Sequence, residues 1–288
     1  MMLTIPPRNT ERVARHTRKS LAQNLTNLGL SAGDTVLVHS SLRSIGPVQD
    51  GARDVVRALL DAAGADGTVV VPTQTLDNRD PSTWRHAPAP EADWPMLRET
   101  LPPFDPATTP STDMGQIAEC VRTWPGAVRS AHPLTSFASV GPKAADLMRV
   151  HSLSSILGEE SPLAELERID ARILLLGVGF EKCTAFHLAE YRSPVRMRYS
   201  ISSVMRTARG REWVSYETIK LDDRDFDALG AEFETQSGSV VRGAVGAAES
   251  RLFSFRDAVR FATEWITHHR PAPCAQEAEL NGGEGQCL

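Results

Sequence analysis

The sequence TVLVHSSLRSIGPVQDGARDVVRALLDAAGADGTVVVP, residues 35–72, decides the fold class. Residues 35–39 and 67–72 are short apolar runs rich in valine, as in buried strands, and the apolar positions of residues 51–63 have the spacing of an amphipathic helix. A strand, a helix and a second strand in this order indicate a β-α-β unit. The pattern predicts an α/β domain whose sheet is covered by helices on both faces.

Similar patterns continue along the chain. Residues 172–177 are the clearest buried-strand pattern, and after a tight loop they lead into a helical stretch at 185–192. The other predicted elements are helices at 11–29, 114–122, 142–149, 224–236 and 254–268, a strand at 136–140, and a hairpin in which 198–206 pairs with 212–219 around Gly210. We therefore predict an α/β fold with a mixed, largely parallel central sheet flanked by helices, and with an antiparallel hairpin in the last third of the chain.

We expect a single domain over residues 11–270, followed by a flexible tail at 271–288 that contains much proline, glycine and glutamate. Residues 73–113 form a long excursion from the sheet pattern, because they carry eight of the 19 prolines and show no clear period. Between residues 77 and 105 six acidic residues stand against three arginines. Long structured loops in compact domains are often functional, so we expect this excursion to border the active site.

The composition excludes several classes of protein. The 288 residues carry a net charge of −5, which disfavours a nucleic-acid-binding protein and permits a cationic small-molecule substrate. No apolar run approaches the ~18 residues that a membrane span needs, and the first residues lack the pattern of a secretory signal. The four cysteines form no C-x-x-C pair, so we expect no metal site and a cytoplasmic chain with reduced thiols.

The first candidate for a site is the segment His39-Ser40-Ser41-Leu42, which directly follows a predicted buried strand. Ligands of open α/β sheets bind at the carboxyl ends of the strands. The backbone N–H groups of a small-residue loop at that place can hold an anion such as a pyrophosphate. The alternative is an ordinary turn whose serines satisfy local backbone groups.

The second candidate is the pair His187 and Glu190, three residues apart on the predicted helix 185–192. Residues at i and i+3 share a helix face, so the imidazole and the carboxylate can act together. Histidine is the usual general base near neutral pH, and a carboxylate can orient it or bind a cationic substrate. An ordinary surface helix and a two-ligand metal site remain as alternatives.

A third histidine, His132, precedes Pro133 in the segment Arg129-Ser130-Ala131-His132-Pro133 and is therefore held on an extended loop. A loop histidine that bonds to backbone is the simpler alternative. Other catalytic motifs are absent: there is no G-x-S-x-G elbow and no P-loop, and a dinucleotide fingerprint that begins at Gly177 has Lys182 where its third glycine belongs. The residues by themselves therefore indicate an α/β enzyme with a histidine-rich cleft.

Six segments occur in an order that resembles the aminoglycoside 3-N-acetyltransferase family, which is unrelated to the GNAT acetyltransferases. They are LVHSSLRSIG at 37–46, FDPATTPSTDMG at 104–115, PGAVRSAHP at 125–133, SPL at 161–163, LLLGVG at 174–179 and HLAE at 187–190. Each segment is weak alone, but the ordered set covers about residues 20–270. The resemblance implies a single transferase domain that moves an acetyl group from acetyl-coenzyme A to the 3-amino group of a 2-deoxystreptamine aminoglycoside, without a metal ion.

The resemblance also implies roles for individual residues. His187 would be the general base that takes the proton of the attacking amine, and Glu190 would orient the site and attract the ammonium groups of the substrate. The remaining implied contacts are His39, Ser40, Ser41, Leu42, Thr112, Met114, Gly115, Ser130 and His132 for the cofactor or the reacting centre, and Asp77 for the aminoglycoside.

Two segments depart from the family pattern. Cys183-Thr184-Ala185 stands where the family usually has Asn-Thr-Thr, and Gly158-Glu159-Glu160 stands where some members have a histidine. These departures concern the acceptor more than the acetyl transfer. A biosynthetic acyltransferase for a different amine is therefore an alternative, and a non-catalytic coenzyme A-binding protein is a second one. The sequence leaves the oligomeric state open, with a homodimer among the options.

Overall fold

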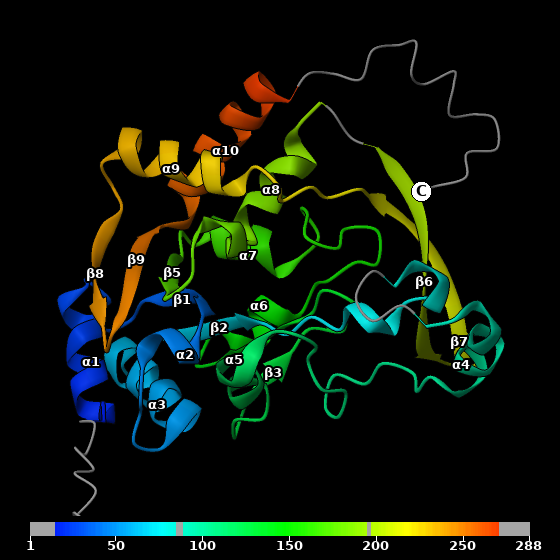
Figure 1. The fold of residues 1–288 in the computed structure, drawn as a ribbon, viewed down its shortest axis with the longest axis horizontal. Coiled ribbons are helices and arrows are strands. Elements are labelled where there is room, and N and C mark those ends of the chain that lie inside the picture. Colours follow the sequence, from blue (N-terminus) through cyan, green and yellow to red (C-terminus); the bar gives the residue numbers. More distant parts are fainter. Residues whose placement is uncertain (1–14, 85–88, 195–196, 271–288) are drawn as a thin grey trace, which may run out of the picture.

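The computed structural model describes residues 15–84, 89–194 and 197–270, which form an α/β body and a separate hairpin (Figure 1). Within these residues one sheet has seven strands in the order β3-β4-β2-β1-β5-β9-β8. The strands are β1 (Thr35–Ser40), β2 (Thr68–Pro72), β3 (Val128–Arg129), β4 (Phe137–Val140), β5 (Arg172–Leu176), β8 (Val241–Val245) and β9 (Ala248–Ser254). The hairpin consists of β6 (Arg198–Thr207) and β7 (Gly210–Ile219).

The predicted fold class is confirmed: the sheet is mixed, helices flank it, and the hairpin lies in the last third of the chain. Parallel pairing is confined to the central strands, where β1 pairs with β2 on one side and with β5 on the other. The outer pairs β2–β4, β3–β4, β5–β9 and β8–β9 are antiparallel. The sheet is therefore less parallel than we expected from the sequence, in part because β8 and β9 were not predicted.

The α-helices of the described residues are α1 (Arg18–Asn27), α2 (Leu42–Ile45), α3 (Gly51–Ala63), α4 (Trp94–Thr100), α5 (Gly115–Arg122), α6 (Ala144–Met148), α7 (Pro162–Arg168), α8 (Ala185–Arg192), α9 (Phe226–Ser237) and α10 (Phe255–His269). Helices α1, α3 and α5 pack together on one face of the sheet, while α7, α8 and α10 pack together on the other. None of the described helices is long and apolar enough to cross a membrane.

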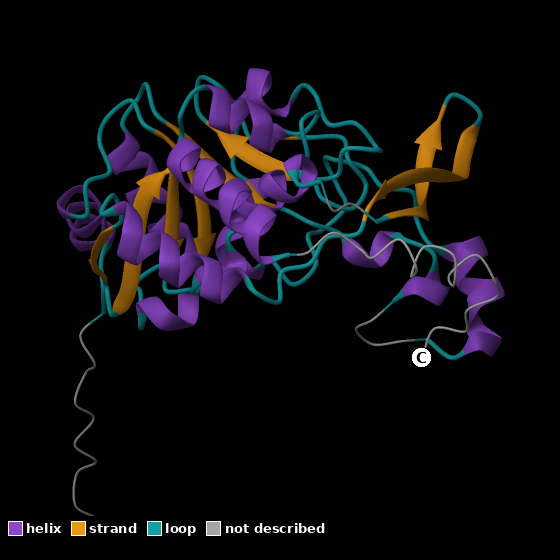
Figure 2. Cartoon of the chain, turned by 90° about the horizontal axis from the view of Figure 1, so that it is seen from above, coloured by secondary structure: helices purple, strands orange, loops and turns teal. Residues whose placement is uncertain are grey.

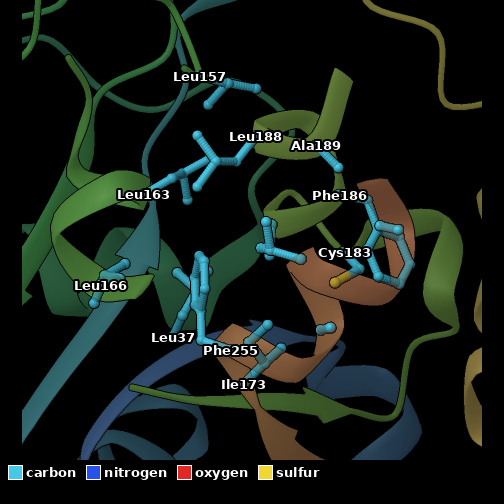
Figure 3. Close-up of a cluster of buried hydrophobic side chains, with 14 of the residues drawn as sticks. Leu37, Leu157, Leu163, Leu166, Ile173, Cys183, Phe186, Leu188, Ala189 and Phe255 are labelled. Atoms are coloured by element: carbon cyan, nitrogen blue, oxygen red, sulfur yellow. The ribbon is translucent and has the colours of Figure 1, made fainter. Parts of the chain in front are cut away.

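The alternation of side chains along β1 divides the interior between these two layers. Leu37 belongs to the core beneath α7, α8 and α10, whereas Val36 and Val38 belong to the core beneath α1, α3 and α5. Figure 3 shows the first of these cores, where Leu37 and Ile173 meet side chains from the helices such as Leu188 and Phe255. Burial on both faces explains why the central strands are continuously apolar in the sequence.

Several predicted elements agree closely with the structure. The helices expected at 51–63 and 185–192 are α3 and α8 with the same limits. Ser254 caps α10 as predicted, by accepting a hydrogen bond from the N–H of Asp257. The expected helix at 11–29 is shorter, since α1 begins at Arg18, and its first residues and the expected tail at 271–288 lie outside the described residues.

The described parts of the excursion, residues 73–84 and 89–113, are structured and pack against the hairpin (Figure 2). It contains α4 and the short 3-10 helices η1 (Leu76–Asn78), η2 (Pro81–Thr83) and η3 (Glu91–Asp93). The N–H of Asp80 donates to the carbonyl of Ser202 at 3.0 Å, and the N–H of Phe104 donates to that of Val204 at 3.1 Å. The excursion and the hairpin therefore support each other beside the sheet.

Candidate active site

The centre of the site is the place where two parallel strands end together. Strand β1 ends at Ser40 and its neighbour β5 ends at Leu176, and the chain after β5 leads through η4 (Phe180–Lys182) into α8. Two cavities meet here, a wide one of about 1360 Å³ and a narrow one of about 380 Å³. Both are lined by Ser40, Asp113, Met114, Val178, Glu181 and Lys182.

His187 lines the narrow cavity, and Glu190 orients it from the next turn of α8. Nδ1 of His187 lies 2.5 Å from Oε2 of Glu190, and the carboxylate is only 4% exposed. Since a carboxylate accepts hydrogen bonds, this contact places the imidazole proton on Nδ1. Nε2 is then the basic nitrogen that remains for chemistry at the cavity.

The other oxygen of Glu190 is also occupied. Oε1 accepts the N–H of Asp222 at 2.9 Å and a hydrogen bond from the guanidinium of Arg270. Glu190 lines neither cavity. The structure therefore favours the orienting role expected for Glu190, and it does not place this carboxylate where a substrate ammonium group would meet it.

His39 lies at the end of β1 and lines the narrow cavity with His187. Burial, helped by the nearby imidazole of His187, lowers the pKa of His39 to about 3, so its ring is neutral at physiological pH. Its Nε2 lies 3.3 Å from the hydroxyl of Thr184, just before α8. The structure thus brings two predicted residues, His39 and His187, to the same cavity.

The loop Ser40-Ser41-Leu42 lines the wide cavity, but not all of its N–H groups are free to bind an anion. The N–H of Ser41 donates to the carbonyl of Leu176 at 2.9 Å, so it is not available to an anion. The hydroxyl of Ser41 caps the short helix α2 by accepting the N–H of Ser44. Part of this loop is therefore the locally satisfied turn that the sequence left as the alternative.

Met114 and Gly115 line the wide cavity at the beginning of α5. Thr112 and Asp77 line neither cavity, and they bond to each other, with the Thr112 hydroxyl donating to Oδ1 of Asp77 at 2.5 Å. Between them and α5, Asp113 borders both cavities with φ of 58°, a left-handed conformation that is uncommon for residues other than glycine. Such conformations cluster at functional sites.

Ser130 and His132 lie away from both cavities and are fully buried. Ser130 donates its hydroxyl hydrogen bond to Nδ1 of His151 at 2.9 Å, and Nδ1 of His132 accepts the N–H groups of Leu134 and Thr135. The two imidazoles stand 4.6 Å apart, and burial lowers the pKa of His132 to about 4 and that of His151 to about 3. These residues hold a loop together beneath the site, which matches the backbone-bonded alternative for His132.

Several residues at the cavities were not identified from the sequence. Arg43 and Lys182 line the wide cavity, and their side chains form no ion pair with any residue that the structure describes. Asp113, Glu181 and Asp223 give the narrow cavity three carboxylates. The available signs were Arg43 and Asp113, which lie inside the segments that resemble the family, and Lys182, which breaks the dinucleotide pattern.

Cys183, where the sequence departs from the family pattern, is fully buried in the core under α8. Burial raises the pKa of its thiol to about 12, so the thiol stays protonated and cannot serve as a nucleophile. Among the described residues no group of three or more His, Cys, Asp and Glu side chains is arranged to hold a metal ion.

Comparison with known proteins gives a consistent set of matches. The family described as "Aminoglycoside 3-N-acetyltransferase" matches residues 37–267. The YokD protein of Bacillus subtilis, an aminoglycoside N(3')-acetyltransferase-like protein, is 40% identical over 88% of this chain and 93% of its own. Aminoglycoside N(3)-acetyltransferase III of Pseudomonas aeruginosa is 34% identical over 87% of this chain and 93% of its own.

Solved structures agree with the sequence matches. The crystal structure of YokD has a TM-score of 0.87 with 39% identity and covers 89% of this chain and 95% of its own. AAC-IIIb in a binary complex with CoASH has a TM-score of 0.80 with 31% identity, covering 90% and 100%. AAC-VIa bound to sisomicin has a TM-score of 0.81 with 30% identity, also covering 90% and 100%.

Proposed function

The chain belongs to the aminoglycoside 3-N-acetyltransferase family, and we propose that it acetylates the 3-amino group of a 2-deoxystreptamine aminoglycoside. Enzymes of this family are acyltransferases that use acetyl-coenzyme A. The observation that carries the proposal is the position of His187, which lines the narrow cavity with Nδ1 bound to the buried carboxylate of Glu190. This is the arrangement of a general base held in one tautomer.

Coenzyme A is assigned to the wide cavity. Its volume of about 1360 Å³ suits a large ligand, and Arg43 and Lys182 supply positive charge for phosphate groups. The first residues of α5 also line this cavity, so the positive end of the helix adds to the attraction for anions. The complex of AAC-IIIb with CoASH supports this assignment at the level of the family.

The acceptor amine is assigned to the narrow cavity. Its carboxylates, Asp113, Glu181 and Asp223, suit a substrate with several ammonium groups. Asp77 lies in the excursion and accepts a hydrogen bond from Thr112, the neighbour of Asp113. It therefore stays in the proposal as an outer contact rather than a lining residue. The sisomicin complex of AAC-VIa supports a cationic acceptor.

The chemistry is direct transfer between the two bound molecules. The neutral amine forms a bond to the thioester carbonyl carbon, and Nε2 of His187 takes the proton that the nitrogen loses as this bond forms. The carbon–sulfur bond breaks, and the thiolate of coenzyme A leaves and takes up that proton. Glu190 stabilises the imidazolium formed on His187. The buried, protonated thiol of Cys183 offers no nucleophile for an acetyl-enzyme, which supports a single transfer step.

A different amine is a second candidate acceptor. The narrow cavity has a volume of about 380 Å³, near the small end of the usual range for ligand sites, and Cys183 and Ala185 replace residues of the family pattern beside it. These observations support a compact polyamine or amino sugar as the second candidate. The protein would then serve a biosynthetic pathway rather than antibiotic resistance.

The test is thiol release from acetyl-coenzyme A with a panel of aminoglycosides and small polyamines, using wild type and His187→Ala. The control variant is His268→Ala, because His268 is an exposed residue near the end of α10. We expect aminoglycoside-dependent release that falls roughly 10²- to 10⁴-fold in His187→Ala and not in the control.

Each outcome selects one assignment. Release with polyamines but not with aminoglycosides would replace the acceptor and keep the transfer chemistry. Saturable coenzyme A binding without release for any amine would favour a non-catalytic binding protein. Full turnover in His187→Ala would remove the proposed base. We place the reaction in the cytoplasm, where acetyl-coenzyme A is available.

A further inference from the structure

Arg270, which follows the last turn of α10, reaches across to the helix that carries His187. Its Nη1 contacts Oε1 of Glu190, and its Nε and Nη2 donate to the two oxygens of Asp225 at 2.8 and 2.5 Å. Nη2 also donates to the carbonyl of Asp222 at 2.6 Å. The side chain of Arg270 is 19% exposed, so this is a largely buried network rather than a surface ion pair.

Glu190 needs this partner because of where it lies. A carboxylate that is 4% exposed is costly to keep ionised unless charge and hydrogen bonds compensate it. Its other contacts are the imidazole of His187 on Oε2 and the backbone N–H of Asp222 on Oε1, which carries no net charge. Within the described residues, Arg270 is the cation that contacts Glu190.

Phe226 joins the same network from α9. Its ring lies 4.8 Å from the ring of His187 and 6.0 Å from the guanidinium carbon of Arg270, measured to the ring centroids. Three segments therefore meet at Glu190: α8 with His187, the beginning of α9 with Asp222, Asp225 and Phe226, and the end of α10 with Arg270. Arg270 fixes the positions of all three.

We propose that Arg270 is a positioning residue for the base, which keeps Glu190 ionised and holds Oε2 of Glu190 against Nδ1 of His187. The inference rests on the proposed function, since it assigns His187 as the base. Arg270 itself lines neither cavity and does not touch the substrate. Its role differs from general stabilisation, because it sets the charge seen by His187.

The charge of Arg270 is secure. Burial by itself would lower the pKa of this guanidinium, but the hydrogen bonds to Asp225 and Glu190 outweigh burial and raise its pKa above the ordinary arginine value. The ionisable groups that face His187 and Glu190 are His39 from β1, Asp113 before α5, Glu181 and Lys182 from η4, Asp222, Asp223, Arg224 and Asp225 before α9, and Arg270 at the end of α10. Of the cations paired with these acids in the described residues, Arg224 pairs with Asp222, whereas Arg270 pairs with Glu190 and Asp225.

Removal of that charge has a defined direction. Without Arg270 the buried carboxylate of Glu190 lacks a compensating cation, so it holds a proton on the His187–Glu190 pair more tightly. That proton then leaves only at higher pH, so Nε2 of His187 becomes available as a base only at higher pH. We expect the acid limb of the kcat profile to move up by roughly one pH unit in Arg270→Gln, as for other charges within 4–6 Å.

The experiment compares Arg270→Gln, Arg270→Lys and Asp225→Asn with the control Arg260→Gln. Arg260 lies on the same helix, is 69% exposed and pairs only with Asp257 among the described residues. We expect kcat of Arg270→Gln to fall roughly 10- to 100-fold with KM changed less than about twofold, as for other groups that orient a catalytic side chain. Arg270→Lys keeps the positive charge, so the pH dependence of its kcat should be close to that of wild type. Asp225→Asn removes an acid and leaves Arg270 next to Glu190, so it should move the acid limb slightly to lower pH.

A second readout does not depend on turnover. The NMR titration of the His187 imidazole, assigned with His187→Ala, should move to higher pH in Arg270→Gln and not in Arg260→Gln. If Arg270→Gln does not fold, Asp225→Asn tests the same electrostatic coupling with the opposite sign, because loss of this acid should move the His187 titration to lower pH. Unchanged titration in the folded variants, or a loss of kcat with no shift of the acid limb, would overturn the role of Arg270. Absence of turnover in wild type would instead overturn the proposed function, while the titration would still decide the inference.

Discussion

Nδ1 of His187 lies 2.5 Å from Oε2 of Glu190, and the second oxygen of the same carboxylate accepts hydrogen bonds from two other donors. The pair comes from adjacent turns of α8, but its geometry depends on Asp222 and Arg270, which lie much later in the chain. A carboxylate can serve all these donors because both of its oxygens accept. This property makes Glu190 difficult to replace.

The first prediction concerns Glu190→Gln. An amide has one acceptor oxygen, so glutamine can face either the N–H of His187 or the donors of Asp222 and Arg270, and one side loses its acceptor. We expect kcat to fall at least about tenfold, with a loss of roughly 1 to 3 kcal/mol in the free energy of unfolding, because a buried donor is left without its acceptor. Steady-state kinetics and urea unfolding measure both. A variant that unfolds like wild type and keeps its kcat would contradict this account.

The second prediction concerns the cations of the wide cavity. Arg43→Ala and Lys182→Ala should each raise KM for acetyl-coenzyme A several-fold, and the double variant more, while KM for the amine stays within about twofold. The physical reason is loss of charge-assisted contacts to phosphate groups. Arg251 lines the same cavity but is already paired with Glu234 and Glu249, so Arg251→Ala should change stability more than coenzyme A binding. Equal effects of all three on KM would argue against the assignment.

The third prediction concerns the carboxylates of the narrow cavity. Asp223→Asn and Asp113→Asn should raise KM for a polycationic acceptor by roughly threefold to tenfold, with less effect on an amine that carries a single charge. The difference between wild type and variants should shrink as salt concentration rises, because salt screens exposed charges. Kinetics at low and high ionic strength measure this. A KM that does not respond to salt in either protein would exclude an electrostatic role.

The fourth prediction is a loss of stability in mild acid. His39 and His132 are buried and His151 is half-buried, and desolvation lowers their pKa values to about 3, 4 and 3. Between these values and the unfolded value of about 6.5 the unfolded chain binds more protons, so unfolding becomes easier as pH falls below 6.5. Each group contributes up to about 1.4 kcal/mol per pH unit in that window. Urea unfolding at pH 7.5 and pH 5 should show the loss.

A matched pair of variants separates this effect from that of the acids. Hydrogen bonding to Arg98 lowers the pKa of the Asp80 carboxyl to about 2. The stabilisation of the folded chain by this pair is therefore lost only at pH values below the ordinary aspartate pKa. Replacement of His151 by Gln should reduce the pH dependence between 7.5 and 5, whereas replacement of the exposed His268 should not. If the free energy of unfolding depends on pH equally in both variants, His151 is not a source of the acid sensitivity.

The fifth prediction concerns Arg129, which ties the excursion to the sheet. Its guanidinium donates to the carbonyl of Thr73 at 2.6 Å, to the hydroxyl of Ser136 and to the carbonyl of Thr109, and it lies 5.0 Å from the ring centroid of Phe104. Arg129→Lys cannot reproduce this set of planar contacts. We expect a loss of about 2 kcal/mol in the free energy of unfolding and faster proteolysis between residues 104 and 111. Arg260→Lys is the control, and equal proteolysis in both would show that Arg129 does not hold the excursion.

The sequence by itself predicted the parts of the molecule that depend on near neighbours. The spacing of apolar residues in 35–72 and 172–192 predicted β1, α3, β2, β5 and α8, because helices and strands repeat their apolar positions every few residues. The i, i+3 spacing of His187 and Glu190 placed them together for the same reason. Strands β8 and β9 were missed because their burial is interrupted by exposed and half-buried positions, which weakens the apolar pattern.

Only the tertiary structure decided what surrounds that pair. Arg270 and Asp222 reach Glu190 across 80 and 32 positions of the chain, and no local pattern records such contacts. The same holds for His132 and Ser130, whose burial beside His151 depends on how the loop at 151–156 folds over them. Periodicity fixes which face of an element is apolar, whereas the partner of a buried charge is chosen only when distant elements pack together and exclude water.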